Sequence, residues 1–331
     1  MALLVTGGTG FVGSAVVRKL LARGEAVRVL VRPSSDLGNL VGLDVELAVG
    51  DLLQPASLRR ALAGVHGLYH VAADYRLWAR DPAMLYRVNI DGTCNLLACA
   101  GAADVARIVY TSSVATLGLD PTGASADEGT AVGLGDMIGD YKRSKFLAEQ
   151  AVRAMAAGGL PVVIVNPSTP VGPGDIKPTP TGRTIREAVR GRMPAYVETG
   201  LNIVHVDDVA EGHLRAFDRG RIGERYILGG DNMLLCDILC AIAAITGGRA
   251  PVLRLPCGAI LPFAWIAECF ARFTGGKEPL LTCDGLKMAR KKMFFTSAKA
   301  ERELGYRHRP ALAALRAAVA YFSPSTTPAA V

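Results

Sequence analysis

A tyrosine and a lysine four residues apart, Tyr141 and Lys145, are the side chains whose types and spacing best suit proton transfer. Residues four apart share one face of a helix, and apolar residues recur at helical spacing over 141–155. A lysine charge beside a phenol stabilises the phenolate, which otherwise forms only near pH ~10. A tyrosine tuned in this way takes a proton from an alcohol as a hydride leaves, and returns it in the reverse direction. The pair therefore predicts acid–base chemistry at an alcohol or ketone.

A serine completes the predicted catalytic group. Ser113 follows a strand-like run at 108–112 and would hydrogen-bond the same substrate oxygen. Taken alone, a tyrosine and a lysine at this spacing are common on amphipathic helices, and a packed tyrosine beside a solvated lysine is the ordinary interpretation. The serine-bearing strand and a glycine-rich loop, which precede the pair in the right order, favour catalysis.

The glycine-rich loop joins a strand-like run at 2–6 to a helical pattern at 11–22. Its glycines match the dinucleotide fingerprint: missing side chains permit a tight turn, let backbone N–H groups approach a pyrophosphate, and let the helix pack closely on the sheet. Packing alone would also explain glycines at such a corner. We expect the dinucleotide to contact Gly7, Gly8, Gly10, Phe11, Val12 and Gly13.

Arg32 stands at the end of the second strand-like run, where NAD-binding folds place a carboxylate on the ribose hydroxyls. An arginine in place of the acid fits a 2′-phosphate better than a free hydroxyl, so the sequence favours NADP(H) and leaves NAD(H) open. In the alternative interpretation, Arg32 caps a loop and Asp36 reaches back to the ribose.

Apolar runs of strand length alternate with helical patterns through the first half of the chain, which predicts a doubly wound α/β fold with a parallel Rossmann sheet. The predicted strands are 2–6, 27–31, 45–49, 68–72, 108–112 and 162–166. The predicted helices are 11–22, 56–63, 82–103 and 141–155.

The pattern changes after Asn166, where five prolines fall within 167–180. This segment leaves the carboxyl end of a strand, the edge where open α/β sheets bind ligands, so it is a candidate substrate wall. We expect a dinucleotide-binding domain at 1–168, to which 203–230 returns through a strand at 203–206 and a helix. Residues 169–202 and 231–322 would form a smaller, mostly helical substrate lobe, and 323–331 a flexible tail.

Composition limits location and partners. Half of the 331 residues are apolar, and the chain opens directly on a strand-like run, so export by a cleaved signal is not expected. The seven cysteines are an odd number and include no C-x-x-C pair, which favours reduced thiols in the cytoplasm. The net charge of +7 is scattered and lacks interleaved aromatics, so nucleic acid is not expected. The basic cluster at 290–292 is interpreted as a solvated face, with an anionic cofactor, substrate or lipid surface as the alternative. The apolar stretch at 255–271 falls short of a transmembrane span but could lie against a membrane.

These motifs together resemble the extended short-chain dehydrogenases, also called the NAD-dependent epimerase/dehydratase family, across essentially the whole chain. Within it the sequence is most similar to hopanoid-associated sugar epimerases and to dihydroflavonol 4-reductase-like proteins. The resemblance is carried by residues 72–78, 111–116, 141–146, 166–170 and 288–295.

The resemblance implies roles for further residues. Cofactor contacts are expected from Asp51, Leu52, Ala72, Ala73, Ser112, Tyr141, Lys145, Pro167 and Ser168. Asn89 would support the active-site strand, unless it is simply a buried amide. Substrate contacts are expected from Asp74, Tyr75, Arg76, Ser113 and Thr169, with Trp78 either a substrate wall or a surface loop. The resemblance also implies a homodimer.

The sequence departs from sugar-nucleotide epimerases at Thr169 and Leu201, where those enzymes carry an asparagine and an arginine that reach the substrate diphosphate. Losing this clamp favours a reductase, or an epimerase of another glycosyl, polyol or lipid-linked small molecule. A dinucleotide-sensing regulator and a membrane-surface assembly subunit remain as alternatives. No metal is predicted, because helix capping by Asp207 or Asp208 and a strand-end contact by His205 explain these residues better.

Overall fold

A computed structural model describes residues 2–76, 81–274 and 282–323. Its larger sheet has seven strands, all parallel. In spatial order they are β10 (Arg225–Leu228), β6 (Val162–Pro167), β5 (Arg107–Thr111), β4 (Val65–His70), β1 (Ala2–Thr6), β2 (Val27–Val31) and β3 (Glu46–Val49). The strand order reverses between β1 and β4, so a ligand crevice is expected at their carboxyl ends. The doubly wound α/β prediction is confirmed.

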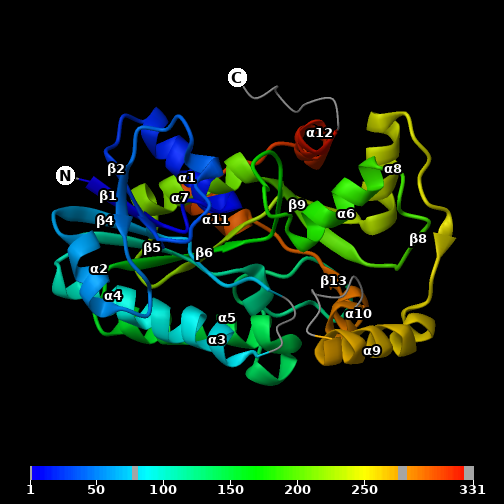
Figure 1. Cartoon of the computed structure of the whole chain (residues 1–331), viewed down its shortest axis with the longest axis horizontal. Coiled ribbons are helices and arrows are strands. Elements are labelled where there is room, and N and C mark those ends of the chain that lie inside the picture. Colours follow the sequence, from blue (N-terminus) through cyan, green and yellow to red (C-terminus); the bar gives the residue numbers. More distant parts are fainter. Residues whose placement is uncertain (1, 77–80, 275–281, 324–331) are drawn as a thin grey trace.

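Helices cover both faces of this sheet (Figure 1). One face carries α1 (Phe11–Ala22), α7 (Val206–Arg219) and α11 (Ala298–Leu304), and the other carries α2 (Pro55–Leu62), α4 (Gly92–Ala102) and α5 (Gly139–Ala157). Strand β1 shows why: Leu3 and Val5 pack into the core with α1 and α7, whereas Leu4 packs into the opposite core. Successive side chains of a strand point to opposite faces, so an uninterrupted apolar strand must be buried on both.

The rest of the chain forms a second lobe with its own sheet. Strand β9 (Gly200–His205) lies at its centre and pairs with β7 (Thr169–Val171), β11 (Asp231–Leu234) and β13 (Lys292–Met293). This sheet packs on α6 (Pro180–Val189), α8 (Leu235–Thr246) and α12 (Ala311–Phe322). The lobe also contains β8 (Ala195–Tyr196), β12 (Leu253–Arg254), α9 (Cys257–Thr274) and α10 (Cys283–Ala289).

Two sequence predictions need correction here. The strand predicted at 203–206, expected to return with the following helix to the first domain, forms the end of β9 and pairs in the second sheet, whereas α7 and β10 lie on the first. The helix predicted at 82–103 is interrupted: α3 (Ala83–Tyr86) leads into a π-helical turn (Arg87–Asp91) before α4 begins. Short 3₁₀ turns lie at Gly38–Leu40, Val114–Thr116 and Leu134–Asp136. Trp78 and most of the predicted tail, 324–331, lie outside the described residues.

Among the helices described, none combines the length and apolar character needed to cross a bilayer.

Candidate active site

The glycine-rich loop turns sharply from β1 into α1. Gly7 has a positive φ of 71°, and a Cβ there would lie 2.7 Å from the backbone nitrogen of Ala72, which follows β4. A Cβ on Gly13 would lie 2.1 Å from the carbonyl oxygen of Gly7, so the helix and the loop touch backbone to backbone. Packing within the protein therefore requires glycine at both positions.

Gly10 is different, because among the described residues a Cβ built there meets one close neighbour, the Gly7 carbonyl oxygen at 3.2 Å. It caps α1 without a side-chain hydrogen bond, and the first turn of α1 carries no acidic residue. Open space in front of an uncapped helix N-terminus is a cradle for an anion. The loop therefore fits the pyrophosphate of a dinucleotide, with Phe11 and Val12 in the first turn.

The predicted ribose contacts stand at the ends of neighbouring strands. Arg32 directly follows β2 and is exposed, and no hydrogen bond or ion pair engages its guanidinium among the residues the structure describes. The backbone N–H of Arg32 donates a hydrogen bond to the Ser35 hydroxyl, and the Asp36 carboxylate accepts one from the backbone N–H of Gly38. After β3, Asp51 accepts from the backbone N–H of Leu53, and Leu52 is buried. Arg32 is therefore available to a ligand.

Tyr141 lies in the first turn of α5, half-buried, and shares a hydrogen bond with the Ser113 side chain at the end of β5. Burial raises the pKa of Tyr141, the bond with Ser113 lowers it, and the Asp74 charge raises it again. The Ser113 oxygen also accepts a hydrogen bond from the backbone of Ala115, 3.1 Å away, which fixes its position. The structure thus brings the predicted serine and tyrosine together.

Lys145 lies one turn further along α5 and is 2% exposed. Its Nζ donates to the hydroxyl of Tyr110 at 3.1 Å and to the carbonyl oxygen of Thr111 at 2.8 Å. Burial lowers the pKa of Lys145 to about 8, and Glu149 opposes that shift. That Lys145 stabilises the Tyr141 phenolate stays a prediction: in this structure Ser113 lowers the pKa of Tyr141, and the Lys145 ammonium donates to the carbonyl oxygen at the end of β5.

Asn89 was predicted to support the active-site strand, and in the structure it joins the loop after β4 to α5. Its amide nitrogen donates to the carbonyl oxygen of Asp74 and to the Ser144 hydroxyl, and its amide oxygen accepts from the Asp74 backbone. Ser144 in turn donates to the carbonyl oxygen of Tyr141. The π-helical turn carries Asn89, in keeping with the frequent use of such turns at functional sites. The sequence analysis did not single out Ser144, although it stands three residues after Tyr141 and so lies on the same side of a helix.

A buried carboxylate, Glu149, lies behind the serine and was also missed. Its Oε2 accepts hydrogen bonds from the Ser112 hydroxyl, the Thr116 hydroxyl and the Asn166 amide at 2.5, 2.8 and 2.8 Å. Its Oε1 pairs with Arg225 of β10 at 3.2 Å. Ser112, which the sequence predicts to contact the cofactor, donates its hydroxyl hydrogen to Glu149. The only sequence signal was the spacing of Tyr141, Lys145 and Glu149, each four residues apart on one helix face.

The predicted substrate contacts lie on segments that face one another. The Tyr75 hydroxyl donates to the carbonyl oxygen of Lys177 in the proline-rich segment, at 3.3 Å. Arg76 pairs with Asp74 at 2.5 Å. Pro167 ends β6 and Thr169 begins β7, with Ala72 and Ala73 following β4. Between these strands the buried Ser168 hydroxyl has no partner in the described residues, so it remains available to a bound group.

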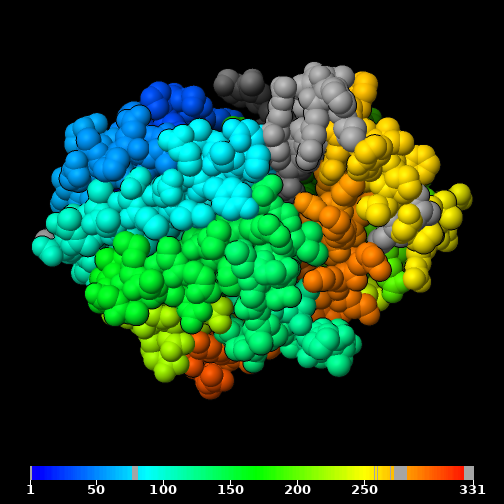
Figure 2. Space-filling view, turned by 90° about the horizontal axis from the view of Figure 1, so that it is seen from below, coloured from blue at the N-terminus to red at the C-terminus, as the bar shows by residue number. Residues whose placement is uncertain are grey.

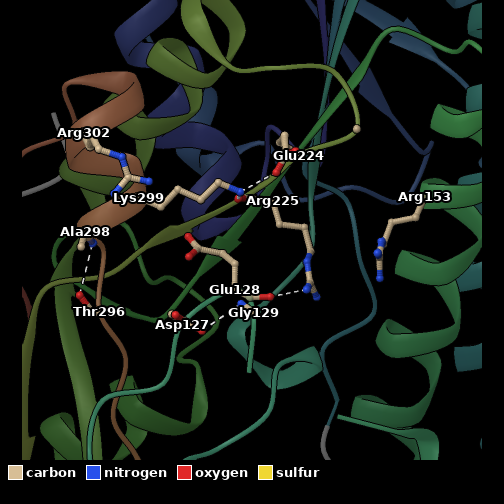
Figure 3. Close-up of a pocket in the computed structure, with 11 residues that line it drawn as sticks. Asp127, Glu128, Gly129, Arg153, Glu224, Arg225, Thr296, Ala298, Lys299 and Arg302 are labelled. Carbon is tan, nitrogen blue, oxygen red and sulfur yellow. Dashed lines mark hydrogen bonds and ion pairs between the residues drawn. The ribbon is translucent and has the colours of Figure 1, made fainter. Parts of the chain in front are cut away.

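A separate cavity of about 450 Å³ lies at the edge of the sheet beside β10 and α11 (Figure 3). Its walls include Arg153, Arg225, Lys299 and Glu224, none of which was predicted as a site residue. Figure 3 shows Arg225 reaching the backbone of Glu128, while Lys299 pairs with Glu224 at 2.6 Å. Because these charges largely neutralise one another, we assign no ligand here.

His205 caps α7, because its ring nitrogen accepts from the backbone of Asp207, and Asp208 pairs with Arg309 at 2.7 Å. The cap predicted at Asp207 or Asp208 is therefore supplied by the histidine. In the described part of the chain, no three His, Cys, Asp or Glu side chains group as metal ligands.

The glycine loop and the Ser113–Tyr141–Lys145 group on this sheet define an oxidoreductase of the extended short-chain dehydrogenase type. The chain belongs to the NAD dependent epimerase/dehydratase family, whose pattern matches residues 3–229. It is 48% identical over 322 residues to a putative dihydroflavonol 4-reductase of Synechocystis, covering 96% of this chain and 93% of that protein. It is 39% identical to sterol demethylase protein B of Methylococcus capsulatus, covering 97% and 98%. The protein in the crystal structure of gox2253 is 54% identical in sequence to this chain, and the two structures superpose with a TM-score of 0.87 over 97% of each chain.

Proposed function

We propose that this enzyme uses NADP(H) to reduce a ketone on an apolar small molecule. The observation that carries the proposal is the hydrogen-bonded pair of Ser113 and Tyr141 beside the buried Lys145. In this proposal Tyr141 is the proton donor and Ser113 the oxygen-binding hydroxyl, next to the proposed dinucleotide crevice.

The bound nicotinamide would supply the hydride to the carbonyl carbon. Tyr141 donates its phenolic proton to the carbonyl oxygen, which becomes the hydroxyl of a secondary alcohol. Ser113 donates to the same oxygen and holds it near Tyr141, because the serine oxygen is itself held by the backbone of Ala115. The charge of Lys145 favours the phenolate left behind, which takes its next proton from solvent.

Three observations support the choice of cofactor and substrate class. The exposed guanidinium of Arg32 suits a 2′-phosphate, which an NAD-specific site would not need. Thr169 and Leu201 supply no charged clamp for a diphosphate. The relatives named for a dihydroflavonol and for a sterol point toward a largely apolar, ring-containing substrate.

The proposal is tested by purifying the protein without added nucleotide, denaturing it in acid, and identifying any dinucleotide released. We expect an empty protein that binds NADPH reversibly and oxidises it in the presence of cyclic ketones. Tyr141→Phe should lower kcat by about a thousandfold with NADPH affinity retained. Equal turnover in the variant would overturn the assignment of Tyr141.

An epimerase is the second candidate, favoured by the family to which the chain belongs. Such an enzyme recycles its own cofactor, so stoichiometric NAD released by acid would support it and would count against the role of Arg32. The division into a dinucleotide domain and a substrate lobe, a homodimer and a cytoplasmic location remain proposals supported by the sequence features above.

A further inference from the structure

Helix α9 presents a broad apolar face to solvent. Leu261, Phe263, Trp265 and Ile266 are 42%, 68%, 62% and 58% exposed. Large apolar side chains gathered in this way usually mark an interaction surface, whereas scattered ones need no explanation.

The opposite face of α9 packs against the rest of the protein. Ala264 and Ala271 are buried, and the Glu268 carboxylate accepts a hydrogen bond from the backbone of Cys283 at the start of α10. The helix is thus anchored to α10 by its inner face, and its aromatic face remains outside the fold.

Basic side chains directly follow α10, the helix to which α9 is anchored. Arg290, Lys291 and Lys292 are all exposed, and no ion pair engages their side chains in the described residues. Figure 2, seen from below, shows the gold atoms of α9 next to the orange segment that includes α10 and these residues. Lys287 is neutralised by Asp284 at 3.1 Å, whereas the three residues of the cluster keep their positive charge unpaired within the described part of the chain.

The same surface adjoins the candidate active site. Asp284 of α10 lies against Gly139, where a Cβ would be 3.0 Å from its carboxylate, and Tyr141 follows two residues later. Burial lowers the pKa of Lys142 to about 8, with a further contribution from the charge of Lys291. The basic cluster therefore lies within electrostatic reach of the first turn of α5.

We propose that α9 and the basic cluster at 290–292 form a docking surface for an anionic lipid bilayer. The aromatic face enters the headgroup region, where tryptophan and phenylalanine are favoured, while the cluster attracts the anionic headgroups. The docked enzyme would hold its active-site mouth close to the membrane and take an apolar substrate from it. This last step rests on the proposed function, whereas docking itself does not.

Docking is tested by co-sedimentation of the full chain with vesicles, in the absence of cofactor and substrate. Binding should be strong to an equal mixture of phosphatidylcholine and phosphatidylglycerol, and weak to phosphatidylcholine alone or at high salt. The double variant Phe263→Ser, Trp265→Ser should bind the anionic vesicles about tenfold less well. A control that removes exposed apolar side chains elsewhere, Val41→Ser with Ile222→Ser, should bind as the unaltered protein does.

The basic cluster has its own variant. Arg290→Gln with Lys292→Gln should remove the preference for anionic vesicles while NADPH binding persists, which shows that the fold is intact. Light scattering without lipid tests a second explanation, that the apolar face of α9 joins two copies of this chain. If the α9 variant changes the oligomeric mass and the unaltered protein does not bind vesicles, this second explanation holds and the docking proposal is wrong. Activity on a water-soluble ketone, measured in parallel, reports on the proposed function independently.

Discussion

The ammonium of Lys145 donates a hydrogen bond to the hydroxyl of Tyr110 at 3.1 Å and lies 4.8 Å from the centre of that ring. The nearby His70 is itself buried, and burial together with the Lys145 charge lowers the pKa of His70 to about 3. The lysine is therefore surrounded by neutral groups, and Glu149 is the charge that favours its protonated form.

Stability should rise with pH because of Lys145. Its pKa falls from 10.5 to about 8 on folding, so between these values the unfolded chain holds a proton that the folded chain has released. The free energy of unfolding should thus increase by about 2 kcal/mol from this group between about pH 7.5 and about pH 9.5. Urea titrations at about pH 7.5 and about pH 9.5 measure this difference in the free energy of unfolding.

Lys145→Met is the matched control, because it keeps the length of the side chain and removes the titrating group. The rise should shrink in the variant but not vanish, since Lys142 titrates in the same direction. An identical rise in both proteins would show that Lys145 is not the source.

The glycine loop offers a pair of substitutions that separate cofactor binding from packing. Gly10→Ala meets one backbone atom at 3.2 Å, so it should alter stability by less than about 1 kcal/mol yet weaken dinucleotide binding at least about tenfold. Gly13→Ala meets the Gly7 carbonyl at 2.1 Å and should destabilise the fold by about 3 kcal/mol. Calorimetry and dinucleotide titration distinguish the two, and equal losses of stability would contradict this division.

Arg32→Ala tests cofactor choice. Removing the guanidinium should raise the Kd for NADPH by about 10- to 100-fold and leave the Kd for NADH nearly unchanged, because only NADPH carries the 2′-phosphate. Arg60→Ala, another exposed arginine, controls for the change in net charge. An unchanged ratio of the two affinities in Arg32→Ala would remove the basis for NADP(H).

Glu149→Gln should destabilise the protein by about 3 kcal/mol, because it leaves Arg225 with an unpaired charge at a largely buried site. It should also move the pKa of Lys145 further below its usual range, since Glu149 is the group that opposes the shift. Glu224→Gln breaks a more exposed pair with Lys299 and should cost less than about 1 kcal/mol. Denaturant midpoints compare the two, and similar values would contradict a structural role for Glu149.

The first sheet was predictable because its strands are apolar runs separated by helical patterns. The strand predicted at 27–31 and the helix at 11–22 match β2 and α1. The second sheet was not predicted, because β7 and β13 are two or three residues long and their pairing with β9 joins segments far apart in sequence. The π-helical turn at Arg87–Asp91 leaves no break in the apolar spacing either.

The candidate site shows the same limit. Tyr141, Ser113 and the glycines lie in short motifs and were found, and the structure brings Ser113 and Tyr141 together. The contact of Lys145 with Tyr110 spans 35 residues and that of Glu149 with Arg225 spans 76, so neither appears as a local pattern. A sequence motif predicts the candidate reacting groups, whereas the buried partners that contact them become visible only in the fold.

Strand β9 gives the molecule an interleaved architecture. It joins β7, β11 and β13 in one sheet, yet the chain leaves that sheet after β9 to build α7 and β10 on the first sheet before returning as β11. Such long-range pairing slows folding, because distant segments must meet before the contacts stabilise one another. A single proteolytic cut between β9 and β10 would leave each fragment with parts of both lobes, so the two halves should stay associated after cleavage.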